Sequence, residues 1–128
     1  MAIAAPQAQA QAAKRAAPPV VQPVETKGLR IEAVHWGRDR GLGQNGGYIE
    51  ALDKRTGQSV WLLQVYKVKQ DPRLEQDAQD RFIRRLALTL GGTHLFVVDK
   101  RGQCFKVDLA THQVAKAAPD CVPPITRP

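Results

Sequence analysis

The chain has 128 residues and a formal net charge of +7 at pH 7, with 19 Lys and Arg against 12 Asp and Glu. This length fits one domain, and without a run of about 20 apolar residues we expect no membrane span. Two cysteines outside any Cys-x-x-Cys pair exclude a zinc site built from cysteine alone, so we expect no metal and no cofactor.

Residues 1–26 are rich in Ala, Gln, Pro and Val and have no periodic apolar face. Such a segment buries too little surface to offset ordering, which predicts a disordered tail. Ala8-Gln-Ala10 and Ala10-Gln-Ala12 have the small-x-small pattern of a signal-peptide cleavage site. The tail is therefore either a signal-peptide remnant or plain low-complexity sequence. The first predicts a periplasmic or secreted protein, the second a cytoplasmic one.

The first half of the domain reads as strands. Residues 29–36 alternate apolar and polar side chains, which predicts a strand. The segment 37–47 carries five glycines in eleven residues and predicts a long loop. Residues 48–53 form a second strand, followed by a turn at 54–57. Residues 60–69 form the longest strand, and apolar side chains on both its faces predict a central place in the sheet.

After that strand the pattern changes. Asp71-Pro72 is typical of a helix N-cap followed by Pro at the first helical position, so we expect a short amphipathic helix from Asp71 to Arg81. Further strands follow at residues 86–90, 94–99, 103–109 and 113–115. The prediction is a mainly β domain over residues 27–116, with one short helix on a single antiparallel curled sheet or partial barrel of six or seven strands. Residues 117–128 form a Pro-rich C-terminal tail.

The two cysteines, Cys104 and Cys121, are candidates for a disulfide in an exported protein. Closing a loop of about 17 residues stabilises a fold by roughly 3 kcal/mol in the chain-entropy model. Cys104 falls on the polar side of its strand, opposite Phe105 and Val107, which argues against a buried inert thiol. The alternative is that both thiols stay free in the cytoplasm.

One strand-turn-strand unit occurs twice. Its second, weaker copy is residues 95–111, and its strong copy is Gly47-Tyr-Ile-Glu-Ala-Leu-Asp53-Lys-Arg-Thr56-Gly57-Gln-Ser-Val-Trp61. The strong copy resembles the blade repeat of pyrroloquinoline-quinone-type β-propellers. The resemblance implies that the side chains of Asp53 and Thr56 close the turn and that Trp61 packs between blades. It covers the hairpin alone and implies no quinone or metal ligand.

The glycine-rich loop also holds the candidate binding site. Gly41 to Gly46 formally matches GxGxxG, but a strand follows where a dinucleotide site needs a helix. Arg38 and Arg40 suit anions, and Trp36 suits stacking. The candidate binding residues are His35, Trp36, Arg38, Arg40, Gln44 and Asn45. The alternative is structural: Trp36 in the core, His35 satisfied and Arg38 solvated.

The function predicted is a small non-catalytic binding or accessory module, exported, that presents loop 37–47 to a protein or small anionic partner. One alternative is a basic nucleic-acid-binding domain that uses Arg38, Arg40, Lys67, Lys69, Arg84 and Arg85. Against it, the cations are scattered and few aromatic residues stand beside them. A second alternative is an enzyme with no identifiable site, because the three histidines lie on separate elements and Ser59 lacks an elbow motif. Oligomeric state is undetermined.

Overall fold

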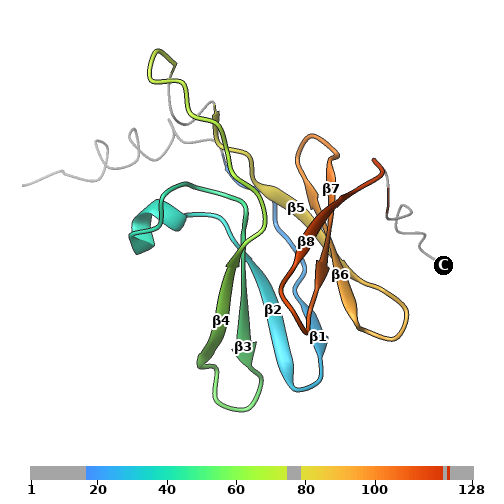
Figure 1. The fold of residues 1–128 in the computed structure, drawn as a ribbon. Helices are drawn as coiled ribbons and strands as arrows, with labels where there is room; N and C mark the ends of the chain where they lie inside the picture. Colours follow the sequence, from blue (N-terminus) through green and yellow to red (C-terminus); the bar gives the residue numbers. More distant parts are fainter. Residues whose placement is uncertain (1–16, 75–78, 120, 122–128) are drawn as a thin grey trace, which may run out of the picture.

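The computed structural model describes residues 17–74, 79–119 and 121. Its eight strands form two four-stranded antiparallel sheets, each with its strands in chain order (Figure 1). Within the described ranges, no helix has the length and apolar character needed to cross a bilayer. The chain is therefore mainly β, as predicted.

The N-terminal sheet has the order β1-β2-β3-β4, and the C-terminal sheet has the order β5-β6-β7-β8. The strands of the N-terminal sheet are β1 Val24–Thr26, β2 Leu29–Val34, β3 Tyr48–Asp53 and β4 Ser59–Gln64. Those of the C-terminal sheet are β5 Ile83–Leu88, β6 His94–Asp99, β7 Cys104–Asp108 and β8 Val114–Ala117.

The prediction of one sheet with six or seven strands is wrong, and the reason lies after β4. The predicted strand over residues 60–69 ends at Gln64 and lies at a sheet edge, with Val60 54% and Leu62 39% exposed. Beyond Gln64, the Gln44 side chain donates a hydrogen bond to the Tyr66 carbonyl and accepts one from the Val68 N–H. β4 pairs with β3 alone in this sheet, and Gln64 lies opposite Tyr48, the first residue of β3, so the pairing ends here.

Two boundaries also differ from the sequence prediction. β1 pairs with β2, so the sheet begins at Val24, three residues before the boundary predicted at residue 27. Of the helix predicted from Asp71 to Arg81, residues 75–78 lie outside the described residues, as do residues 1–16 of the predicted tail, and among the others only Gln79 is helical. Around it, Pro72 to Leu74 form a turn and residues 80–82 have no regular structure.

The core lies between the two sheets. Alternate residues along each strand point to the same face, and the inward ones are the most buried residues of the chain. The members with no exposed surface are Ile31, Ile49, Ala51, Ile83, Leu95, Val97 and Val107. Because both sheets contribute, neither buries its apolar face without the other.

The two repeated units fold into the same turn. The Asp53 Oδ1 atom accepts the N–H groups of Arg55 at 2.8 Å and Thr56 at 3.1 Å. In the second copy, Asp108 Oδ1 accepts those of Ala110 at 2.8 Å and Thr111 at 3.1 Å. Each turn ends on a residue with positive φ, 77° at Gly57 and 65° at His112. An Asp/Thr side-chain pair thus fixes both hairpins.

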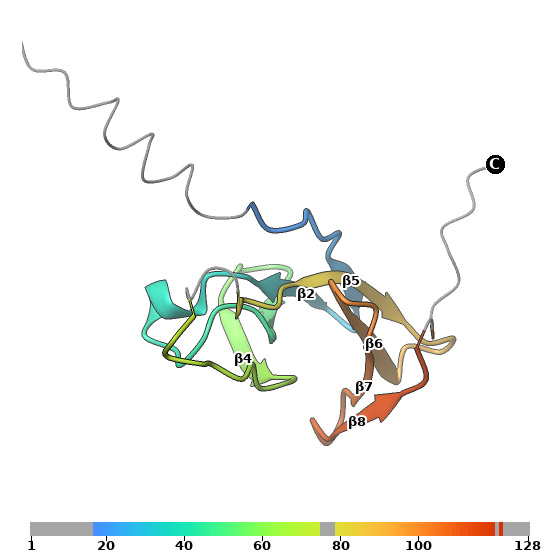
Figure 2. The same ribbon diagram turned by 90° about the horizontal axis from the view of Figure 1, so that it is seen from above.

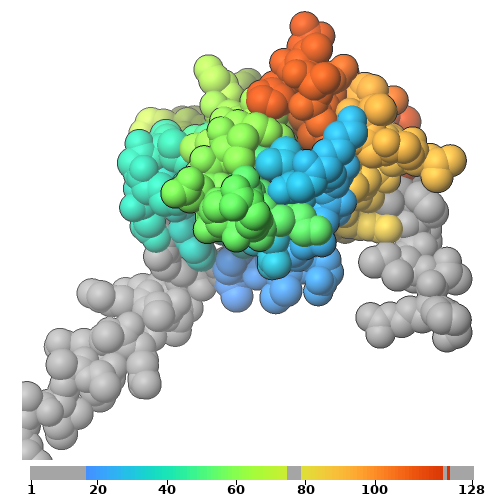
Figure 3. Space-filling model, turned by 90° about the horizontal axis from the view of Figure 1, so that it is seen from below, coloured from blue at the N-terminus to red at the C-terminus, as the bar shows by residue number. Residues whose placement is uncertain are grey.

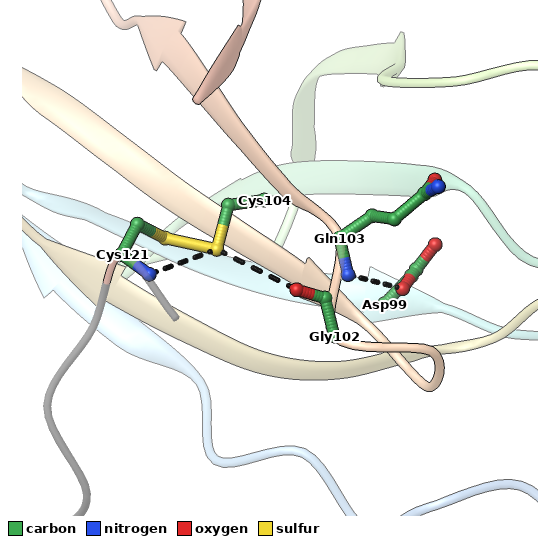
Figure 4. Close-up of a disulfide and its surroundings, with 5 residues drawn as sticks. All are labelled: Asp99, Gly102, Gln103, Cys104 and Cys121. Carbon is green, nitrogen blue, oxygen red and sulfur yellow. Dashed lines mark hydrogen bonds between the residues drawn. A yellow bond between two sulfur atoms is a disulfide. The ribbon is translucent and has the colours of Figure 1, made fainter. Parts of the chain in front are cut away.

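Cys104 and Cys121 form a disulfide with Cα atoms 6.2 Å apart (Figure 4). Cys104 is 2% exposed, and it is buried as one half of a disulfide and not as an inert thiol, which agrees with the expectation from its polar-side position. The Cys121 N–H also points to Cys104 Sγ at 3.2 Å. The chain after β8 is thereby fixed to the first residue of β7.

We expect loss of this disulfide to lower the free energy of unfolding by roughly 3 kcal/mol, because it closes a loop with a sequence separation of 17. Chemical denaturation of wild type and of the double variant Cys104→Ser plus Cys121→Ser measures the difference. The control is dithiothreitol, which should destabilise wild type and leave the double variant unchanged. Two free thiols in protein taken from its native compartment would contradict the bond.

Candidate functional site

The glycine-rich loop 37–47 divides into an exposed half and a buried half. Its first residues form the 3-10 turn η1, Gly37–Arg40, in which Arg38, Asp39 and Arg40 are exposed. Its last residues run inside the molecule, and Gln44 and Asn45 are each 5% exposed. The loop is therefore only in part the surface feature that the sequence suggested.

The two buried amides are already bonded within the protein. Gln44 Nε2 donates to the carbonyls of Gly46 at 2.9 Å and Tyr66 at 2.8 Å, while Oε1 accepts the Val68 N–H at 2.8 Å. Asn45 accepts the Arg38 N–H at 3.0 Å and donates to Asp80 at 3.2 Å. Each side chain is 5% exposed and makes its hydrogen bonds inside the protein, so both have a structural role, and their binding of a partner stays a prediction.

His35 and Trp36 also have structural contacts. His35 Nε2 lies 2.8 Å from the Pro19 carbonyl, to which it donates. The rings of His35 and Trp36 both meet Phe82 edge-on, with centroids 5.3 and 5.2 Å away. Burial lowers the pKa of His35, against the opposing effect of the Pro19 hydrogen bond. Both residues hold the segment after β2 against Phe82, which precedes β5, and His35 also holds Pro19, which precedes β1.

The two arginines differ. Arg40 forms a bidentate pair with Glu50, at 3.0 and 2.8 Å, and this pair lowers the pKa of Glu50. The Arg38 side chain is exposed and forms no ion pair with the described residues. Of the six predicted binding residues, Arg38 alone therefore presents an exposed cation without a carboxylate partner in the described part of the chain.

A cavity that the sequence analysis missed lies at the end of the molecule where the segment after β4 meets the β6–β7 turn. Its volume is about 640 Å³, and Figure 2 looks onto this end. Among the described lining residues there is no carboxylate; Glu75 and Asp77, which follow the lining residue Leu74 in the chain, lie outside the described residues. The lining cations are Lys67, Lys69, Arg81, Arg101 and Lys116.

One of these cations is neutralised and the others are not. Arg81 Nε lies 2.8 Å from Asp99 Oδ2, and the Asp99 side chain is 0% exposed. The exposed cations, Lys67, Lys69, Arg101 and Lys116, form no salt bridge with any described residue. Within the described residues, the cavity thus presents positive charge from three separate segments of the chain with no carboxylate paired to it.

Aromatic rings form one wall of this cavity. Tyr66 stacks on Phe105 with ring centroids 5.0 Å apart, and the Arg81 guanidinium lies 4.5 Å from the Tyr66 centroid. The Tyr66 hydroxyl donates to the Arg81 carbonyl. Burial raises the pKa of Tyr66 well above its ordinary value, so this hydroxyl keeps its proton and its hydrogen bond at neutral pH.

The glycine-rich loop holds this wall in place. A Cβ atom on Gly46 would lie 2.4 Å from the Arg81 carbonyl oxygen, and one on Gly47 would lie 2.8 Å from that of Tyr66. Both glycines have positive φ, 77° and 86°. Only glycine allows the loop to approach both wall segments this closely. The loop therefore supports the site from behind, and does not form its surface.

One pattern in the sequence could have located the cavity. Lys67 and Lys69 alternate with the buried Tyr66 and Val68, so they share one face of an extended segment. Arg101 and Lys116 lie more than 30 residues further along the chain, and only the packing of the two sheets brings them to the same cavity.

No family model matches the chain, and no curated protein matches it. Among the residues that the structure describes, no group of three His, Cys, Asp or Glu side chains is arranged to hold a metal ion. The candidate site is thus defined by its charge and shape.

We expect Gly46→Ala to lower the free energy of unfolding by roughly 2–4 kcal/mol, since the added methyl group meets the Arg81 carbonyl at a left-handed backbone position. Gly43→Ala is the matched control, because a Cβ there meets nothing within 4 Å, and should stay within about 0.5 kcal/mol. Urea denaturation measures both. Equal stability of the two variants would contradict the supporting role of the loop.

Stability should also depend on pH through His35. Burial lowers its pKa in the folded state, so below the ordinary value of 6.5 the unfolded chain binds a proton that the folded chain resists. The free energy of unfolding should therefore fall as the pH is lowered from about 7.5 to about 5.5. The variant His35→Gln should show a shallower slope over this range in urea denaturation. An unchanged slope would contradict the assignment.

Proposed function

We propose that this protein is a small binding module whose partner is anionic and occupies the cavity formed by Lys67, Lys69, Arg101 and Lys116, the basic cavity. The observation that carries the proposal is the uncompensated charge of these four side chains around one hollow of about 640 Å³. Like charges gathered around a concave surface raise the local concentration of an opposite charge. The partner is a protein segment rich in carboxylates or a small anion.

The chemistry of the four side chains suits such a partner. Arg101 offers a planar fork for a carboxylate or phosphate group, while the lysines offer flexible point charges. Tyr66 and Phe105 add an apolar surface beside them. Arg81 forms an ion pair with Asp99, so it stabilises the wall, and the exposed cations are the ones that bind the partner.

We also infer that the protein acts outside the cytoplasm. The Cys104–Cys121 bond supports this, because structural disulfides persist in oxidising compartments. The bond lies beside the basic cavity. The lining residues Arg101 and Gln103 come just before Cys104 in the chain. Lys116 lies opposite Phe105, the residue after Cys104. Holding β7 and β8 together there keeps two of the four cations in place.

We also propose that the two sheets are related to the blades of β-propellers. What supports it is that each sheet is a four-stranded antiparallel meander, the form of a propeller blade. Trp61 of the N-terminal sheet also packs on His112 of the C-terminal sheet, with ring centroids 4.5 Å apart. The relation carries no cofactor and no reaction to this chain.

The η1 turn remains a second candidate surface for the predicted presentation of loop 37–47. The observation that favours it is the exposed Arg38 side chain, which has no ion pair with the described residues. Arg38→Ala tests it separately, and unchanged binding of the partner would remove η1 from the interface.

The basic cavity predicts binding of anions that weakens as salt rises. We expect a fluorescein-labelled hexaglutamate peptide and inorganic pyrophosphate to bind wild type at low salt, and the affinity to fall at least tenfold in the variant Lys67→Gln, Lys69→Gln, Arg101→Gln, Lys116→Gln. Fluorescence anisotropy measures the peptide and calorimetry the pyrophosphate. Because all four side chains are exposed, the variant should fold.

A charge-matched control separates the cavity from overall charge. The variant Arg30→Gln, Lys54→Gln, Arg55→Gln, Lys106→Gln removes the same charge from exposed sites elsewhere and should bind as wild type does. Equal losses in both variants would contradict a localised site. Tighter, strongly salt-dependent binding of single-stranded or duplex DNA than of either probe would favour the nucleic-acid alternative.

A further inference from the structure

A second cavity, of about 470 Å³, lies at the opposite end of the space between the sheets. This volume falls within the roughly 300–1,000 Å³ of small-molecule sites. Figure 3 shows this end of the molecule, where blue residues of the β1–β2 hairpin meet orange residues of the C-terminal sheet. The walls come from Leu29, Ile31 and Trp61 on one side and from Gly92 and Leu109 on the other.

The walls are apolar and held in place. Ile31 is 0% exposed and belongs to the core, while Leu29, Trp61 and Leu109 are half-buried against that core. The His112 ring supports Trp61 from the side, with centroids 4.5 Å apart. The cavity therefore offers a preformed slot for an apolar body, with an aromatic ring along one wall.

The rim of the cavity carries one carboxylate, Asp108, and one cation, Lys27. Asp108 Oδ1 accepts the N–H groups of Ala110 and Thr111, and its Oδ2 lies 3.6 Å from His94 Nε2. Glu25, the carboxylate nearest in sequence to Lys27, is paired with Lys54 at 3.1 Å. Lys27 lines the cavity and forms no ion pair with any described residue.

The backbone conformation at Lys27 also supports a role for this lysine at the cavity. Lys27 and Gly28 have φ values of 51° and 78°, as in the type I′ turn of a two-residue hairpin. Asn or Gly is the usual residue at the first of these positions, because a longer side chain is strained there. A lysine held in this conformation places an uncompensated cation at the mouth of an apolar cavity.

We infer that this cavity binds a small amphipathic monocarboxylate, with its aliphatic or aromatic body between Trp61 and Leu109 and its carboxylate at Lys27. The apolar walls bury the body, and the Lys27 ammonium group meets the carboxylate at the rim. This site is separate from the basic cavity, with which it shares no lining residue.

Decanoate and decanol test the inference, because they share an apolar chain and differ in the carboxylate. In calorimetry, wild type should bind decanoate about fivefold more tightly than decanol, the gain expected of one exposed ion pair. The variant Lys27→Asn should bind decanoate only as tightly as decanol. Asn suits the left-handed turn better than Lys, so this variant should be at least as stable as wild type.

Two further variants locate the binding. Ala110 is exposed at the mouth, and Ala110→Phe should weaken both ligands at least tenfold by filling the entrance. The four-residue variant of the basic cavity should bind decanoate as wild type does. No binding of either ligand at millimolar concentration would overturn the site. Unchanged binding by folded Ala110→Phe would overturn its location, and equal affinities for the two ligands in wild type would overturn the role of Lys27.

Discussion

The Gln44 side chain is the contact on which the arrangement of this protein depends. Its amide accepts the Val68 N–H and donates to the Tyr66 carbonyl, while the chain beside it, at Gly46 and Gly47, touches the backbones of Arg81 and Tyr66. Buried amide groups must be hydrogen bonded, and leaving one unsatisfied costs about 1–3 kcal/mol. These bonds therefore hold the segment after β4 against the glycine-rich loop and fix where the connection to the C-terminal sheet runs.

That fixed connection gives the molecule two different ends. At one, the segment with Lys67 and Lys69 comes to lie beside Arg101 and Lys116, and a basic cavity results. At the other, the hairpin turns of both sheets meet around an apolar cavity. The glycine-rich loop thus supports the charged site, while the Asp108 turn, one of the two Asp/Thr turns, helps to line the apolar one.

The two Asp/Thr turns also show how similar local sequences serve different roles. The Asp53 turn ends on Gly57, above open space. The Asp108 turn ends on His112, whose ring supports Trp61. Hydrogen bonds within each turn are the same, since they depend on Asp and Thr alone. The second turn supports a wall of the apolar cavity because it has His112 where the first turn has Gly57.

The sequence by itself determined the elements that local physics controls. Alternation predicted the strands at residues 48–53 and 94–99 with the bounds that the structure has. The Asp/Thr pattern predicted both turns, and Cys104 and Cys121 are bonded as proposed. Periodicity and turn chemistry act over a few residues, so they can be read directly from the chain.

Only the tertiary structure decided how these elements combine. The sequence could not show that β4 would end at Gln64, that the amide of Gln44 would bond the segment beyond it, or that the strands would form two sheets. For the same reason Gln44 and Asn45 read as binding residues when they are internal supports. A polar residue in a glycine-rich loop looks the same whether it faces solvent or a distant backbone, because the contacts that distinguish the two cases are separated by more than 20 residues.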